Sequence, residues 1–137
     1  MRRRILSLVF LFSFLVSSGQ ETFRSMFYNL LEFPEAFPSS RKYILRDILG
    51  VAQPDIFMVC ELQSEEGADM ILETSLNHNR DDYTRAPFIP SESGALEHQQ
   101  LLFYKRKMFT LEATEAIGTE VRDINYYLLK LNTADHL

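Results

Sequence analysis

The stretch Pro54-Asp55-Ile56-Phe57-Met58-Val59-Cys60-Glu61-Leu62 decides the fold that we expect for this chain. It opens with a turn signal, continues through five residues without a charge, and then reaches the carboxylate of Glu61. A short apolar run of this kind is typical of a strand that is buried on both faces. Glu61 is therefore expected at the rim of a sheet, where α/β folds bind ligands. The alternative is a solvated charge at a strand end, because most exposed glutamates have no chemical role.

The segments before this strand predict a first strand, a loop and a helix. The side chains of Phe23, Ser25 and Phe27 alternate with those of Arg24, Met26 and Tyr28 up to Asn29, and aromatic residues favour a strand. Two prolines exclude a regular helix from residues 30–38, so this stretch is expected to form a loop. An apolar stripe then predicts a helix over residues 41–51, capped by a preceding serine and ended by Gly50 and Pro54.

The segments after the central strand predict one more helix and then strands. Ser64 can cap a helix that carries glutamates in its first turn and a buried stripe ending at Leu76. Extended pieces are then expected over residues 83–88, 99–105, 109–117 and 126–131, joined as an antiparallel meander. Strands and helices alternate first and strands follow alone, which indicates an α+β domain with its helices on one outer face of a sheet.

The N-terminus has the three regions of a secretory signal peptide. Three arginines at residues 2–4 precede an apolar run over residues 5–16, and Ser17-Ser18-Gly19 supplies small residues before a cut at Gln20. As a helix the run would span roughly 18 Å, which is shorter than the hydrocarbon core of about 30 Å and disfavours a membrane anchor. We therefore expect residues 1–19 to be removed, the protein to be exported to the periplasm or secreted, and residues 20–137 to form one domain without a membrane span.

The charge and the cysteine count limit the partners and the crosslinks. Loss of the three arginines in residues 1–19 lowers Lys+Arg from 14 to 11 against 19 Asp+Glu, so the mature chain carries a net charge of about −8. This excess of acid argues against a general polyanion-binding surface but does not exclude a local cationic or metal-filled site. Cys60 is the only cysteine, so no disulfide can form within the chain.

Two stretches together resemble the N-terminal half of the endonuclease/exonuclease/phosphatase (DNase I-like) superfamily. FRSMFYNLLEF (residues 23–33) is followed by PDIFMVCEL (residues 54–62), and QQLLFYKRKMF (residues 99–109) is similar to a strand hairpin of that family. The resemblance implies an incomplete four-layer α/β/β/α sandwich, with two helices on one face and an antiparallel strand meander. It also implies hydrolysis of a phosphate ester with Mg²⁺ or Mn²⁺, as in a nuclease, phosphatase or phosphodiesterase that acts on nucleic acid, a phospholipid head group or a small phosphoester.

The same resemblance assigns the expected catalytic residues. Glu61 would be the metal carboxylate, because hard divalent cations prefer oxygen ligands. Asn29 would orient the phosphate or other groups of the site through its amide. Without the resemblance, Asn29 is a turn residue that ends a strand.

Other elements of the family pattern are not found. An Asp-x-Asn pair and a Ser-Asp-His base have no match, and we do not assign Ala134-Asp135-His136, which directly follows the last predicted strand. The chain is therefore expected to be a fragment of a hydrolase that is inactive as it stands. The alternative function is a secreted, non-catalytic α/β module that binds a partner through an exposed strand edge.

Overall fold

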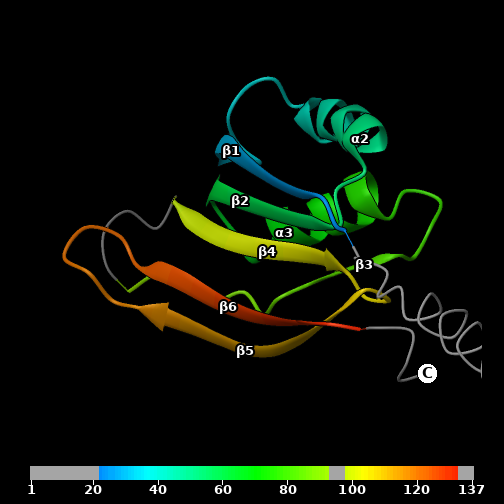
Figure 1. The fold of residues 1–137 in the computed structure, drawn as a ribbon. Coiled ribbons are helices and arrows are strands. Elements are labelled where there is room, and N and C mark those ends of the chain that lie inside the picture. Colours follow the sequence, from blue (N-terminus) through cyan, green and yellow to red (C-terminus); the bar gives the residue numbers. More distant parts are fainter. Residues whose placement is uncertain (1–21, 93–97, 133–137) are drawn as a thin grey trace, which may run out of the picture.

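The computed structural model describes residues 22–92 and 98–132 (Figure 1). The elements in chain order are β1 (Ser25–Phe33), α2 (Arg41–Ala52), β2 (Ile56–Leu62), α3 (Glu65–Met70), the π-helix η1 (Ile71–Leu76), β3 (Tyr83–Arg85), β4 (Gln99–Lys105), β5 (Phe109–Ile117) and β6 (Ile124–Leu131). The predicted signal peptide and Ala134-Asp135-His136 lie outside the described residues. None of the helices in the described part is long and apolar enough to cross a membrane.

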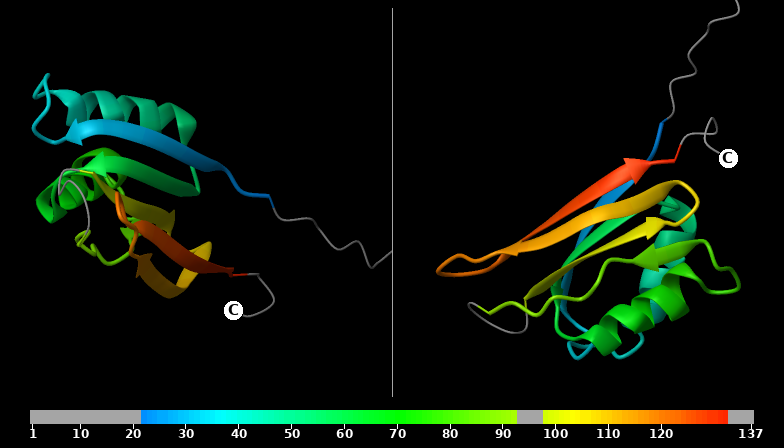
Figure 2. Two further views of the ribbon diagram at one scale, coloured as in Figure 1. Left: turned by 90° about the vertical axis from the view of Figure 1, so that its left-hand side faces the viewer. Right: turned by 90° about the horizontal axis from the view of Figure 1, so that it is seen from below.

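The central strand predicted from residues 54–62 is β2, which lies inside a four-stranded sheet of order β1-β2-β4-β3. β1 and β2 are parallel and are joined by α2, whereas β4 is antiparallel to both β2 and β3. The hairpin of β5 and β6 forms a separate two-stranded sheet. Figure 2 shows the helices on one side of the four-stranded sheet and the hairpin on the other.

The two faces of β2 are covered to different extents. Phe57 and Val59 are 0% and 1% exposed and belong to the core, and the ring of Phe57 lies 5.9 Å from that of Phe103 on β4. The alternate residues Ile56, Met58 and Cys60 are only partly buried. The expected burial is therefore complete on one face, while the hairpin covers the other face in part.

β1 and α2 both continue beyond their predicted ends. β1 does not stop at Asn29 but runs to Phe33, because Leu30 and Phe33 are almost fully buried and hold the end of the strand on the core. The loop predicted for residues 30–33 is therefore wrong. Gly50 lies within α2, and the helix ends where Gln53 adopts a left-handed conformation with φ 44°.

The predicted meander is also wrong at one connection. β4 and β5 do not pair, although a turn over residues 106–108 joins them as expected. β5 instead pairs only with β6, and Phe109, Leu111 and Leu129 pack against the core from the hairpin side. Burial of this apolar side of the hairpin favours a second layer over the extension of the first sheet.

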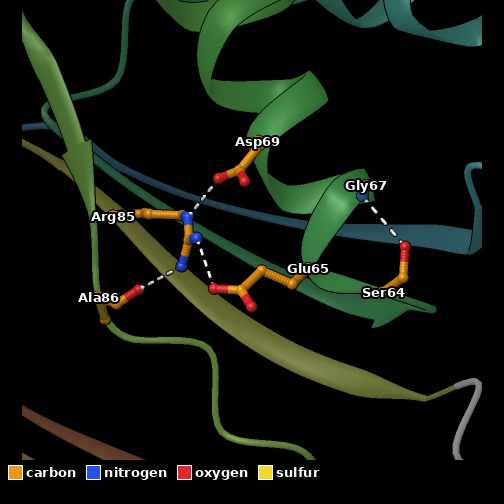
Figure 3. Close-up of polar contacts among 6 residues, drawn as sticks. All are labelled: Ser64, Glu65, Gly67, Asp69, Arg85 and Ala86. Carbon is orange, nitrogen blue, oxygen red and sulfur yellow. Dashed lines mark hydrogen bonds and ion pairs between the residues drawn. The ribbon is translucent and has the colours of Figure 1, made fainter.

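The second helix begins at the predicted cap. The backbone N–H of Gly67 donates to the Ser64 hydroxyl at 3.1 Å (Figure 3). Arg85 on β3 reaches across to the same helix and donates to Asp69 and Glu65, both at 2.8 Å. These partly exposed ion pairs each contribute about 1 kcal/mol or less, so they fix the position of β3 more than they stabilise the fold.

Candidate functional site

The candidate residues lie at one end of the strands of the four-stranded sheet. The carboxyl ends of the parallel strands β1 and β2 meet there, and β4 begins there because Gln99 lies opposite Leu62. The connection between β5 and β6 lies at the same end (Figure 1), where the side chain of Gln100 donates to the carbonyl of Asp123 at 3.1 Å. We call this end of the sheet the rim; it comprises residues 29–33, 60–62, 98–100 and 118–125.

Asn29 and Glu61 contact each other at the rim. Asn29 Nδ2 donates to Glu61 Oε1 at 2.8 Å, and Asn29 Oδ1 accepts the backbone N–H of Leu31 at 2.8 Å. The N–H of Leu31 fixes which end of the amide faces Glu61. Within the described part of the chain, no hydrogen bond reaches the second carboxylate oxygen of Glu61. The structure thus brings the two candidate residues together.

A left-handed residue makes this contact possible. In the parallel register Asn29 pairs with Cys60, so a regular strand would place Glu61 on the opposite face of the sheet. Glu61 instead has φ 57°, and the pairing of β2 with both neighbouring strands shifts in register around it. The irregularity turns the carboxylate toward Asn29, which is a known role of bulges beside functional sites.

The ends of β1 and β2 are tied together beyond the contact. The N–H of Gln63 donates to the carbonyl of Phe33 at 2.9 Å, and the Gln63 side chain accepts the N–H of Glu35 at 3.0 Å. Gly67 on α3 packs so closely that an added Cβ would lie 3.0 Å from Pro34 Cδ. The loop after β1 is therefore held by the hydrogen bond from Glu35 to the Gln63 side chain and by the packing of Pro34 against Gly67.

The rim also includes an arginine that the sequence analysis did not identify. Burial raises the pKa of the Cys60 thiol and the charge of Glu61 raises it further, while the guanidinium of Arg122 opposes this increase. Arg122 is exposed in the β5–β6 connection, where its N–H and C=O groups bond to the Thr119 hydroxyl at 3.1 and 2.6 Å. No motif marks an isolated arginine in a loop, so only the fold reveals its electrostatic effect on Cys60 at the rim.

The other possible ligands do not join this site. In residues 22–92 and 98–132, no group of three or more His, Cys, Asp or Glu side chains is placed to hold a metal ion. His78 is exposed in a turn, and His98 is half-buried just before β4 with its Nδ1 buried and without a hydrogen bond. Glu61 is thus a single carboxylate ligand candidate, supported by one amide.

Comparison with known proteins finds a similarity of structure but none of sequence. No family model matches the sequence, and no curated protein matches it. Among solved structures, the human Nocturnin catalytic domain with bound sulfate anion matches with a TM-score of 0.60 and 18% identity, covering 82% of this chain and 46% of that chain. The chain thus spans less than half of the solved domain. Over the matched length it has the fold of the DNase I-like endonuclease/exonuclease/phosphatase superfamily, of which Nocturnin is a member.

Proposed function

We propose that this chain carries the first part of an exported phosphoesterase that depends on a divalent metal. The observation that supports this proposal is the 2.8 Å contact between Asn29 and Glu61 at the rim of a fold similar to the Nocturnin catalytic domain. That domain was solved with a sulfate anion, which has the tetrahedral shape and the charge of a phosphate group. The proposed substrate is accordingly a phosphate ester: nucleic acid, a phospholipid head group or a small phosphoester.

The residues at the rim fit a Mg²⁺ or Mn²⁺ ion. Mg²⁺ is usually held by one or two carboxylates together with waters and substrate phosphates, so a single carboxylate is a sufficient protein contribution. Glu61 keeps one oxygen without a hydrogen bond among the described residues, and Asn29 holds the other oxygen in place. The chemistry that such an ion supplies is neutralisation of phosphate charge and stabilisation of the leaving oxygen.

The chain's own residues then have separate roles. Glu61 provides the negative oxygen, Asn29 sets its orientation, and Arg122 brings a positive charge to the same edge, where it can attract an anionic ester. None of the described groups is assigned as a general base, a contribution that is typically worth about 10²–10⁴-fold in rate. We therefore expect slow or absent turnover by this chain alone.

Titration with inorganic phosphate tests this proposal without requiring turnover. We expect calorimetry on the full chain to detect phosphate binding in the presence of Mg²⁺ and to lose it with EDTA. Glu61→Gln should also lose it, whereas Glu35→Gln, which changes an exposed glutamate of the next loop, should retain it. Phosphate binding that is independent of Mg²⁺, or equal in wild type and Glu61→Gln, would refute the assignment.

A second candidate function has one observation in its favour. β1 is an edge strand of the sheet, and Phe27 on it is 65% exposed, so the strand offers an apolar edge to a partner chain. A non-catalytic module of this kind would bind its partner equally well with or without EDTA. Export is proposed for both functions, and mass spectrometry of the secreted product should find Gln20 as the first residue.

A further inference from the structure

The C-terminal end of β1 contains a backbone conformation that needs external support. Leu31 and Glu32 are consecutive non-glycine residues with φ values of 46° and 56°. Side chains disfavour this left-handed region, so two such residues in sequence persist only where the surroundings hold them. The N–H of Leu31 is also the group that orients the Asn29 amide, at 2.8 Å. Whatever holds Leu31 therefore acts on the contact between Asn29 and Glu61.

Arg41, the first residue of α2, is the group that holds this end of β1. Its Nη1 donates to the carbonyl of Leu31 at 2.9 Å and to the carbonyl of Ala36 at 3.3 Å. Its guanidinium also lies over the Phe33 ring, 5.6 Å from the centroid. One side chain thus joins the middle of the bend, its buried end and the following turn. The planar guanidinium suits several fixed acceptors and an aromatic face at once, which a lysine ammonium does not.

We infer that Arg41 is a positioning residue for Glu61, acting through Leu31 and Asn29. The inference rests on the proposed function, because it concerns the carboxylate that would hold the metal. Arg41 fixes the carbonyl of Leu31, the N–H of the same residue orients the Asn29 amide, and that amide holds one oxygen of Glu61. Loss of the guanidinium should therefore weaken metal binding at Glu61 without removing any ligand atom.

The test compares Arg41→Ala and Arg41→Lys with Arg46→Ala in the full chain. Arg46 is a matched control on the same helix, since its guanidinium also lies over an aromatic ring, 5.3 Å from the centroid of Tyr43. Mn²⁺ is the probe, and its apparent Kd is taken from the broadening of NMR signals of the rim. We expect the Kd to rise about tenfold in Arg41→Ala, as for other residues that orient a ligand, to rise less in Arg41→Lys, and to change less than twofold in Arg46→Ala.

A second readout separates this inference from the proposed function. The side-chain NH₂ signals of Asn29, identified by their loss in Asn29→Asp, should shift in Arg41→Ala without any metal and stay in place in Arg46→Ala. If wild type binds no Mn²⁺ but these signals shift, the proposed function fails and the positioning role stands. If Arg41→Ala does not fold, the same two readouts on Arg41→Lys decide. Unchanged Asn29 signals together with an unchanged Kd would overturn the inference.

Discussion

Asn29 and Glu61 are joined by a 2.8 Å hydrogen bond although the register of β1 and β2 pairs Asn29 with Cys60. A regular β2 would point Glu61 to the other face of the sheet. The left-handed conformation of Glu61, φ 57°, therefore makes the contact possible. The bend at Leu31 and Glu32 supports the contact from the neighbouring strand β1. Conformations of this kind are disfavoured by about 1–2 kcal/mol per residue, which is consistent with a site that the surrounding fold maintains.

Asn29→Ala should weaken metal binding while leaving the fold intact. The substitution removes the donor that holds one oxygen of Glu61, and the loss of such a partner typically lowers metal affinity about 10–100-fold. Mn²⁺ titration of the full chain measures the effect. Asn132→Ala is the control, because the amide oxygen of Asn132 also accepts a hydrogen bond, from Thr110 at 2.9 Å, at the hairpin end away from the rim. Equal affinities in the two variants would contradict the role of Asn29.

Gly67→Ala should destabilise the chain, because the new methyl group would approach Pro34 Cδ to 3.0 Å and Leu62 Cδ1 to 3.2 Å. Overpacking of this kind typically costs about 1–3 kcal/mol. In α2, Gly50→Ala meets nothing within 4 Å and should instead stabilise the helix, by about 0.5–1 kcal/mol. Urea unfolding of both variants measures these changes in the free energy of unfolding. No loss of stability in Gly67→Ala would contradict the packing described for α3, and a loss in Gly50→Ala would contradict the open space described beside α2.

The ion pair between Asp55 and Lys105 should make stability depend on pH in the acid range. Burial alone would raise the pKa of Asp55, but hydrogen bonds from Lys105, at 2.7 Å, and from the N–H of Arg24 outweigh it and hold the pKa below its usual 3.8. A carboxylate with a lowered folded pKa contributes stability that is present above the unfolded pKa and is lost as the pH falls through the folded pKa.

The expected result is a wild-type advantage over Asp55→Asn at pH 6 that decreases below about pH 4, the range in which an unfolded aspartate takes up its proton. Urea unfolding at a series of pH values provides the comparison. Lys105→Met should reduce the same acid dependence, since it removes the main hydrogen-bond donor to Asp55. A stability difference that stays constant from pH 6 to pH 3 would show that Asp55 has an unperturbed pKa.

Phe27→Lys should reduce self-association of the chain. Phe27 is 65% exposed on the edge strand β1, and a charge on an exposed edge opposes pairing with another sheet. Analytical ultracentrifugation at several concentrations gives the comparison with wild type. Phe37→Lys removes an even more exposed ring, 91% exposed, from a loop outside the sheet. If both variants reduced association equally, general hydrophobicity would be responsible and not the edge of β1.

The sequence predicted the elements that depend on local pattern. β4 and β5 have the bounds expected from residues 99–105 and 109–117, and Ser64 caps α3 as its position suggested. These features arise from alternation, short turns and capping, which act over a few neighbouring residues. The fold resemblance carried by residues 23–33 and 54–62 is likewise shown by the structural match.

Features that depend on distant contacts were not predictable in the same way. The extension of β1 to Phe33 depends on burial against β2 and α3, and the separation of β4 from β5 depends on how the hairpin packs. The left-handed conformation of Glu61 and the electrostatic effect of Arg122 on Cys60 result from the meeting of segments far apart in the chain. Asn29 and Glu61 could be named from sequence, but the geometry that joins them could not.

The central claim is that Glu61 provides a carboxylate ligand for a divalent ion, and paramagnetic line broadening by Mn²⁺ tests it most directly. In a ¹⁵N-labelled full chain, we expect small amounts of Mn²⁺ to broaden first the signals of Asn29, Leu31 and Glu61, and excess Mg²⁺ to restore them. Glu61→Gln should abolish this selective broadening, while Glu65→Gln on α3 should preserve it. Broadening centred away from the rim, or unchanged at the rim in Glu61→Gln, would contradict the account.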